Sequence, residues 1–273
     1  MAIKRSKHTL RELGVKPSRH RGQNFLQDQA VIDRILEYAG PLNGENLIEI
    51  GPGLGALTRE LVPYGNLRVI EIEPSFCQEL ANLFPDLQII NADVRSVNLS
   101  EMGPDLVVLG NLPYRYSTDI IFHLIDHAAA IKFAVLMLQR EFAERLAAGP
   151  GGRDYGVLSI AAQLWADIST GPRISKESFY PRPQVESSLV RLEFLRKPRY
   201  EIADLDWFKK VVRAGFLQRR RKLANSLKSS GIFSGDQILE ALSVCNIDGG
   251  RRAETLGIGE FVELAGALRR NQD

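Results

Sequence analysis

Short apolar runs alternate with amphipathic stretches between about residues 30 and 140. The apolar runs have the length of strands, and the stretches between them have helical spacing. Strands are expected at residues 47–50, 67–72, 87–90, 106–110 and 133–138, and helices at 57–62, 75–84, 119–127 and 140–147. Strands that alternate with helices predict a parallel sheet with helices on both faces, which is an α/β fold.

The pattern changes after residue 147. A Gly-rich loop at residues 149–154, with the composition of a mobile segment, precedes a helix that ends near Trp165. Two further strand-like runs follow, at residues 166–174 and 187–194, and their spacing suggests an antiparallel edge hairpin. Residues 197–199 read as a linker, and beyond about residue 202 only helices are expected. We therefore predict a basic amino-terminal arm (1–22), a seven-stranded Rossmann-like catalytic domain (23–197) and a small all-α C-terminal domain (198–273).

A glycine-rich loop, EIGPGLG at residues 49–55, connects the first strand of this alternation to the next helix. Glycines at a helix start let a ligand approach the backbone closely, so this context predicts a nucleotide-type cofactor. The spacing is not that of a dinucleotide site, because residue 56 is alanine.

Acidic residues follow the next two strands. Glu71, about 20 residues after the loop, is the leading candidate to accept hydrogen bonds from two ribose hydroxyls. Glu73 is a close competitor, because alternation along a strand places it on the same face. Asp93, after the third strand, can accept from an adenine amino group. Each acid alone is more often a solvent-exposed group at the end of a strand. The glycine-rich loop, Glu71 and Asp93 stand at three successive strand ends, however, and together they favour a cofactor site.

The tetrad Asn111-Leu112-Pro113-Tyr114 follows the buried run at residues 106–110. An adenine amino group is a poor nucleophile, because its lone pair is delocalised into the ring. The Asn111 side-chain oxygen and the main-chain carbonyl before Pro113 can accept its two hydrogens, and Tyr114 can stack on the base. The alternative is an ordinary turn, since Asn and Pro are turn residues.

Charge is unevenly distributed along the 273-residue chain, whose net charge is only +2. The first 22 residues hold seven Lys or Arg against one acid, which leaves 28 basic and 32 acidic residues elsewhere. A second basic cluster consists of Arg213, Arg219, Arg220, Arg221, Lys222 and Lys228. Each region alone can be a solvated surface, but two of them around an acidic body favour a nucleic-acid partner.

Composition is ordinary for a globular chain, with 44% apolar and 25% charged residues. No apolar stretch is long enough to span a bilayer and the amino terminus lacks a secretory core, so we expect a cytoplasmic protein. Cys77 and Cys245 are expected to be free thiols. His123 and His127 are spaced like a metal pair but lack a third ligand, so no metal is predicted and both are expected on a helix surface.

These features together resemble the class I S-adenosylmethionine-dependent methyltransferases, and more specifically the small-subunit ribosomal RNA adenine N6,N6-dimethyltransferases. The resemblance spans nearly the whole chain and rests on residues 22–26, 49–55, 69–71, 111–114, 179–183, 218–220 and 225–227. It implies methyl transfer from S-adenosylmethionine to two adjacent adenines in a hairpin near the 3′ end of 16S RNA, by direct in-line displacement and without a metal. The implied partner is an immature small subunit, and the enzyme is expected to be a monomer.

The resemblance also implies roles for single residues. Asn24 and Leu26 should close over the cofactor, and Gly51 should face its methionine part. Glu71 should bind the cofactor ribose and Asp93 its adenine. Catalytic roles are implied for Asn111, which should touch both cofactor and target amine, for Pro113 and Tyr114 in the base pocket, and for Phe179, which should stack on the other face of the target adenine.

Arg115-Tyr116 departs from the Asn-Ile that is common after this tetrad in the family, which puts the outer pocket in question. Two further readings stay open. One is a large-subunit RNA dimethyltransferase of the resistance type, which shares the tetrad but not the matches in the C-terminal helical region. The other is a non-catalytic ribosome assembly factor. A DNA adenine methyltransferase is disfavoured, because enzymes of that class usually have a second Pro at the position that Leu112 occupies in this chain.

Overall fold

The computed structural model describes residues 5–17 and 22–270, and the chain forms two compact units. The first unit comprises Met1–Ala143 and Ala166–Lys197, and the second comprises Glu144–Trp165 and Pro198–Asp273. The two units are described separately below.

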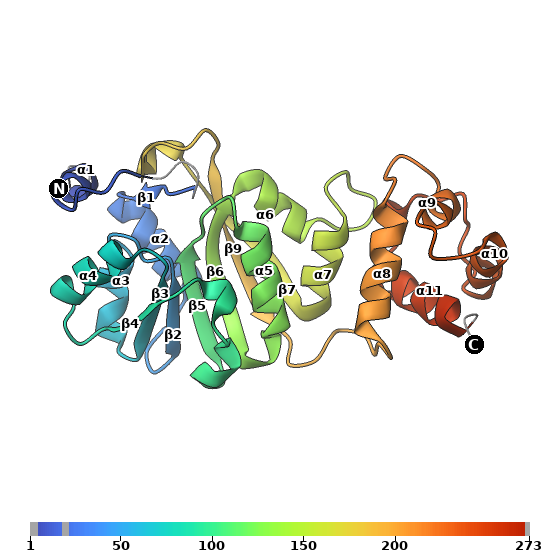
Figure 1. The fold of residues 1–273 in the computed structure, drawn as a ribbon, viewed down its shortest axis with the longest axis horizontal. Coiled ribbons are helices and arrows are strands. Elements are labelled where there is room, and N and C mark those ends of the chain that lie inside the picture. Colours follow the sequence, from blue (N-terminus) through green and yellow to red (C-terminus); the bar gives the residue numbers. More distant parts are fainter. Residues whose placement is uncertain (1–4, 18–21, 271–273) are drawn as a thin grey trace. The chain divides into compact units, whose positions relative to one another are not determined.

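A seven-stranded sheet forms the centre of the first unit (Figure 1). Its strands in spatial order are β4 (Gln88–Asn91), β3 (Leu67–Glu71), β2 (Asn46–Ile50), β5 (Leu106–Asn111), β6 (Ile131–Gln139), β9 (Ser187–Phe194) and β7 (Ala166–Ile174). The first five are parallel, whereas β9 is antiparallel to both β6 and β7. The predicted α/β sheet is confirmed, and so is the antiparallel hairpin at its edge, in which β7 pairs with β9 and β9 pairs in turn with β6.

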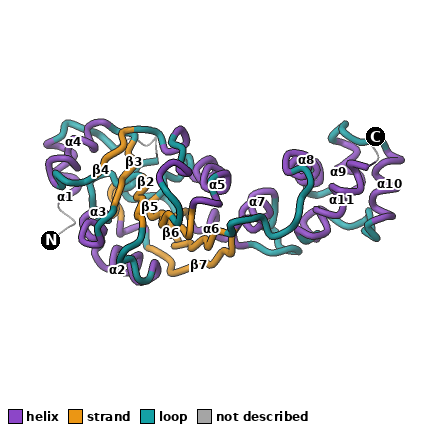
Figure 2. The backbone as a smooth tube through the Cα atoms, turned by 90° about the horizontal axis from the view of Figure 1, so that it is seen from below, coloured by secondary structure: helices purple, strands orange, loops and turns teal. Residues whose placement is uncertain are grey.

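Helices cover both faces of this sheet. Figure 2 shows α2 (Gln29–Ala39) and α3 (Thr58–Leu61) on one face and α5 (Ser117–Asp126) on the other. The remaining helices that begin in this unit are α1 (Arg5–Glu12), α4 (Pro74–Leu83) and α6 (Arg140–Ala147). Apolar residues of α2 and α3 form one core with those of the strands, including Ile35, Leu61, Leu109 and Val135. This burial is the main source of stability for the sheet.

The parallel register brings four strand ends to one edge of the sheet. Ile50 of β2 pairs with Ile70 of β3 on one side and with Gly110 of β5 on the other. From β2 the chain adds β3 and β4 on one side of the sheet and then continues with β5 on the other side, so the strand order reverses between β2 and β5. Ligands of open α/β sheets bind at such a point. Gly110 permits this close pairing, because a Cβ there would lie 2.7 Å from the Ile50 carbonyl oxygen.

A second, two-stranded sheet joins segments that are far apart in the sequence. In it β1 (Phe25–Leu26) pairs antiparallel with β8 (Phe179–Tyr180). Two further bonds extend the contact: the Gln27 amide donates to the Ser178 carbonyl (2.9 Å), and the Ser178 hydroxyl donates to Asp28 (2.8 Å). This sheet fixes residues 24–26 over the carboxyl edge of the main sheet.

The second unit is helical within the described residues. It contains α7 (Val157–Trp165), α8 (Leu205–Phe216), α9 (Leu223–Ser229), α10 (Gly235–Val244) and α11 (Ile258–Arg270). Tyr155, Ile160 and Leu164 are buried in one core with α8 to α11. The boundary predicted at residue 197 agrees with this division, but residues 144–165 belong to the helical unit. Residues 144–165 therefore interrupt the predicted catalytic segment 23–197, because their apolar side chains are buried against the C-terminal helices.

The predicted amino-terminal arm, residues 1–22, lies partly outside the described residues, since 1–4 and 18–21 are not described. Within the rest, α1 packs on the first unit, because Leu10 is buried in a cluster with Phe25 and Phe76. Residues 5–17 thus belong structurally to this unit.

Candidate active site

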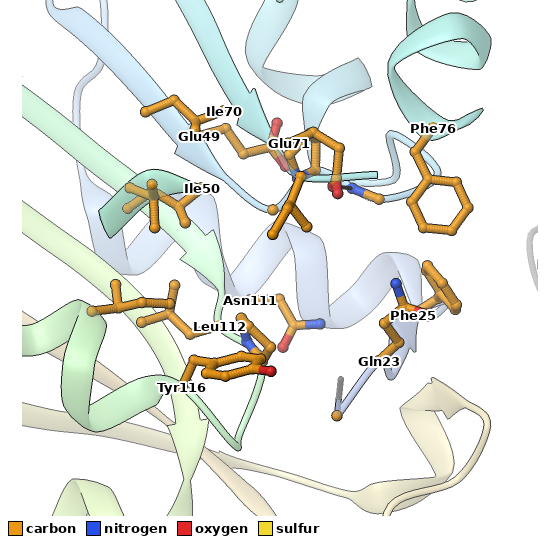
Figure 3. Close-up of a pocket in the computed structure, with 18 of the residues that line it drawn as sticks. Gln23, Phe25, Glu49, Ile50, Ile70, Glu71, Phe76, Asn111, Leu112 and Tyr116 are labelled. Carbon is orange, nitrogen blue, oxygen red and sulfur yellow. Dashed lines mark hydrogen bonds between the residues drawn. The ribbon is translucent and has the colours of Figure 1, made fainter. Parts of the chain in front are cut away.

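A cavity of about 380 Å³ opens at the carboxyl edge of the sheet, between the glycine-rich loop and the start of α5 (Figure 3). Such a volume is within the range of small-molecule sites. Eight of the residues predicted from the sequence line it: Asn24, Leu26, Gly51, Glu71, Asp93, Asn111, Pro113 and Tyr114. Residues separated by up to 90 positions in the chain are thus brought together by the parallel strand ends and the β1–β8 pairing.

Gly51 is the first residue after β2, and its backbone has φ +67°, which side-chain-bearing residues rarely adopt. Its amide donates to the Ile70 carbonyl at 2.9 Å. Among the described residues other than Gly51 and its two chain neighbours, no atom lies within 4 Å of the position that a Cβ would take. Because Gly51 lines the cavity, this arrangement leaves room for a ligand directly against the backbone.

Glu71, the last residue of β3, holds the glycine-rich loop in place. It is 5% exposed, and its two carboxylate oxygens accept from the amides of Gly53 (3.1 Å) and Glu73 (2.9 Å). Burial raises the pKa of Glu71, and these hydrogen bonds oppose the rise. Glu73 is the N-cap residue that precedes α4 and does not line the cavity, so the structure distinguishes the two acids that the sequence left in competition.

Glu49 is a second buried acid on the cavity wall, 2% exposed. The hydroxyl of Thr58 donates to its Oε2 atom at 2.6 Å. Burial raises the pKa of Glu49 to about 8, despite this hydrogen bond, and the nearby charge of Glu71 adds to the rise. Glu49 is therefore protonated in the folded protein at neutral pH.

Replacing Glu49 with glutamine is expected to stabilise the protein at alkaline pH. The unfolded chain releases this proton above its ordinary pKa of 4.5, whereas the folded chain keeps it up to about pH 8, so wild-type stability falls as the pH rises between these values. Glutamine remains neutral and can still accept from Thr58. The melting temperature of Glu49→Gln should exceed that of wild type by several degrees at about pH 8.5 but by little at about pH 5. Glu37→Gln, on the exposed face of α2, is the control and should show no such pH-dependent gain.

Asp93 lines the cavity after β4, but its carboxylate is already paired within the protein. The Arg95 guanidinium donates to both carboxylate oxygens, and the Arg95 amide donates to Oδ1 at 3.0 Å. The Arg95 pair lowers the pKa of Asp93, which is therefore ionised at neutral pH. Sequence reasoning did not single out Arg95, although a basic residue two positions after the acid is a short-range signal.

Asn111 ends β5 and is fixed by a hydrogen bond from its Nδ2 atom to the Asn24 carbonyl, at 2.8 Å. This bond leaves the amide oxygen as the acceptor that Asn111 can offer a ligand. The Pro113 carbonyl accepts from the amide of Tyr116 (3.0 Å) and the hydroxyl of Ser117 (3.2 Å) at the start of α5. The second acceptor predicted for an amine is thus the carbonyl of Leu112.

Tyr114 is partly buried beside these acceptors, and its hydroxyl lies 2.6 Å from that of Ser187. Burial raises the pKa of the Tyr114 phenol, which is therefore neutral. This hydrogen bond to β9 fixes the ring at the cavity wall and leaves it suited to contact a planar base.

Phe179, which the family resemblance assigns to the target adenine, lies in the core of the first unit. The ring is 4% exposed and packs in the core of the first unit with Leu26, its partner across the β1–β8 pair. It is absent from the described residues that line the cavity. In this structure the Phe179 ring is packed among apolar residues of the core and is not presented to the cavity.

The two histidines lie at the carboxyl end of α5, where both are partly exposed. His123 is half-buried with Nε2 3.0 Å from the Val97 carbonyl, and His127 has Nδ1 2.9 Å from the His123 carbonyl. In the part of the chain that the structure describes, no three His, Cys, Asp or Glu side chains gather as a metal site. None of the helices in this part is long and apolar enough to cross a membrane. Cys77 and Cys245 are both free, as predicted.

Comparison with known proteins agrees with this geometry. Residues 16–269 match the family described as Ribosomal RNA adenine dimethylase. The Ribosomal RNA small subunit methyltransferase A of Syntrophotalea carbinolica is 40% identical over 255 residues, which cover 92% of this chain and 96% of the relative. That of Bacillus cytotoxicus is 40% identical over 282 residues, covering 97% of this chain and 95% of the relative.

Solved structures show the same fold. A dimethyladenosine transferase from Plasmodium falciparum superposes with a TM-score of 0.75 at 26% identity, covering 88% of this chain and 95% of the other. The 23S rRNA methyltransferase ErmE gives a TM-score of 0.67 at 24% identity, covering 90% and 100% of the two chains, and this likeness concerns the fold alone.

Proposed function

Because this chain belongs to the ribosomal RNA adenine dimethylase family, we propose that it methylates N6 of two adjacent adenines in a hairpin near the 3′ end of small-subunit ribosomal RNA. The observation that carries the proposal is the cavity that gathers Gly51, Glu71 and Asp93 beside Asn111. Each adenine receives two methyl groups from S-adenosylmethionine, so the product is N6,N6-dimethyladenosine.

The cavity walls fit the chemistry of this cofactor. Gly51 leaves open space against the backbone for the methionine part, and the Glu71 carboxylate can accept from ribose hydroxyls. Asp93 is an acceptor for the adenine amino group, while Asn24 and Leu26 cover the cavity from the β1–β8 sheet. When bound, S-adenosylmethionine supplies a methyl group that its positive sulfonium has already activated.

The tetrad positions the target amine for in-line attack. The Asn111 amide oxygen and the Leu112 carbonyl accept the two N6 hydrogens, which localises the nitrogen lone pair, and Tyr114 holds the plane of the base. Transfer would form the bond from N6 to the methyl carbon as the bond from that carbon to sulfur breaks, with S-adenosylhomocysteine as the leaving group and the N6 proton passing to water. The protein contributes position and electrostatics, with no covalent enzyme intermediate.

A small-subunit substrate is favoured over a large-subunit one. The two relatives named for small-subunit RNA match this chain over both units, whereas the likeness to the 23S enzyme is one of fold. We propose an immature small subunit as the acceptor, bound by a monomeric enzyme. A cytoplasmic location completes the proposal, and the two free thiols agree with a reducing compartment.

The substrate assignment can be tested by offering three acceptors in parallel. Tritiated S-adenosylmethionine is incubated with the enzyme and unmethylated small subunits, naked small-subunit RNA or large subunits. Labelling of small-subunit adenines as dimethyladenosine is expected, and labelling confined to large subunits would overturn the assignment. A protein that binds small subunits without labelling any of them would instead be an assembly factor.

The basic cluster of the second unit provides a prediction on RNA binding. Arg220 and Arg221 are exposed, whereas Arg219 donates to the carbonyls of Arg153 (2.6 Å) and Tyr155 (2.7 Å) and so anchors the preceding loop. Arg220→Ala/Arg221→Ala is expected to weaken RNA binding and to reduce the slope of log affinity against log salt by about 1 for each lost phosphate contact.

Filter binding of small-subunit RNA at several salt concentrations measures this slope. Lys132→Ala/Arg196→Ala removes the same charge elsewhere, from side chains paired with Glu45 and Asp105, and serves as the control. An unchanged slope in the Arg220/Arg221 variant would exclude these arginines from the RNA interface. Arg219→Ala should instead lower the melting temperature, because the carbonyls of Arg153 and Tyr155 lose their donor.

A further inference from the structure

The side chain of Arg95 occupies the acceptor that the proposed function assigns to the cofactor adenine. Its Nε atom lies 3.0 and 3.1 Å from the two carboxylate oxygens of Asp93, and Nη2 donates to Oδ2 at 2.5 Å. The Arg95 amide adds a fourth contact, to Oδ1. A carboxylate offers about four lone-pair positions, so Arg95 alone fills them. An adenine amino group can reach Asp93 well only if the guanidinium withdraws.

Arg95 has two other partners toward which it can withdraw. Its Nη1 atom lies 3.2 Å from Oδ2 of Asp119, on the first turn of α5. Its guanidinium carbon lies 4.7 Å from the centroid of the Tyr116 ring, a distance at which a cation is attracted to an aromatic face. The Arg95 side chain is 36% exposed, so it can move without disturbing the core.

Tyr116, the aromatic partner of Arg95, lies at the cavity itself. Figure 3 shows the Tyr116 ring on the same side of the cavity as Asn111, across from Glu71. Arg95 and Tyr116 both line the cavity. An aliphatic side chain there would give Arg95 no aromatic face to rest on.

We propose that Arg95 is a positioning residue that sets the affinity for the cofactor adenine, by releasing Asp93 and pairing instead with Asp119 over the Tyr116 ring. The inference rests on the proposed function, because it takes Asp93 as the acceptor of the adenine amino group. Cofactor binding thereby exchanges one partner of Arg95 for another at a partly exposed site. The affinity then reflects the difference between the two pairings.

The first experiment removes the competitor. Arg95→Met keeps the length of the side chain but loses the charge and the donors. Calorimetric titration with S-adenosylhomocysteine is expected to show about three- to fivefold tighter binding, the range of a partly exposed ion pair. An analogue with hydrogen in place of the 6-amino group should bind wild type and variant equally, because it makes no demand on Asp93. Lys132→Met, which breaks the exposed Lys132–Glu45 pair, is the matched control and should not change affinity.

The second experiment removes the alternative partner. Asp119→Asn is expected to weaken S-adenosylhomocysteine binding about two- to fivefold, because Arg95 is then held more firmly on Asp93. The same change in the Arg95→Met background should have no effect, so the two substitutions are not additive. Weaker or unchanged binding in Arg95→Met, or an equal gain with the analogue that lacks the amino group, would overturn the inference. If wild type does not bind S-adenosylhomocysteine at all, the proposed function fails and this inference fails with it.

Discussion

Replacing Asn111 with alanine is expected to reduce methyl transfer by about a hundredfold or more, the effect of removing one well-placed polar group that acts on the reacting atoms. The substitution removes the amide oxygen that accepts from the target N6, and it also removes the hydrogen bond that ties β5 to the Asn24 carbonyl. Single-turnover transfer of tritiated methyl groups to unmethylated small subunits measures the loss.

Particle binding separates catalysis from assembly in the same variant. Asn111 lies in a cavity of the first unit and not among the exposed basic residues, so the affinity of Asn111→Ala for small subunits should change little. Asn82→Ala, on the exposed face of α4, is the control and should retain both activities. Dimethylation by Asn111→Ala at the wild-type rate would show that the tetrad does not hold the amine.

Replacing Glu71 with alanine is expected to weaken the binding of S-adenosylhomocysteine by about a hundredfold, which corresponds to the loss of two hydrogen bonds to a charged group. The variant loses the proposed ribose acceptors and also the anchor of the Gly53 amide, so the glycine-rich loop is no longer fixed. Calorimetry on the purified protein measures the affinity without RNA.

Glu73→Ala provides the matched control for this result. Glu73 stands two residues further on, at the start of α4, and does not line the cavity. Its replacement should change the affinity for S-adenosylhomocysteine by less than about threefold. Equal losses of affinity in the two variants would mean that Glu71 contributes only its negative charge and is not a specific hydrogen-bond acceptor. Glu71→Gln keeps one acceptor and should bind with intermediate affinity.

The strands and the glycine-rich loop were predictable because their signals are local. A buried parallel strand is a short apolar run, and the end of each run fixed where Gly51, Glu71 and Asn111 would lie along the chain. Parallel pairing then carries these positions to one edge, as the register of Ile50 with Ile70 and Gly110 shows. Eight predicted residues therefore line one cavity.

The pairing of β1 with β8 was not predictable in the same way. Each strand has only two residues, too short for any periodicity, and some 150 residues separate them. This pairing nonetheless decides which side chains reach the cavity. It places Asn24 and Leu26 at the cavity, while Phe179, opposite Leu26, packs in the core.

The sequence by itself determined the order of the strands along the chain, the glycine-rich loop, the acidic strand ends and the tetrad, because these depend on residue type and on neighbours within a few positions. The tertiary structure alone decided the rest. It separated Glu71 from Glu73 and assigned residues 144–165 to the helical unit. It also closed Arg95 on Asp93 between Asp119 and Tyr116. These outcomes depend on which distant surfaces are buried together and on which charges then lie within a few ångströms of one another. A pattern of neighbouring residues in the sequence determines neither.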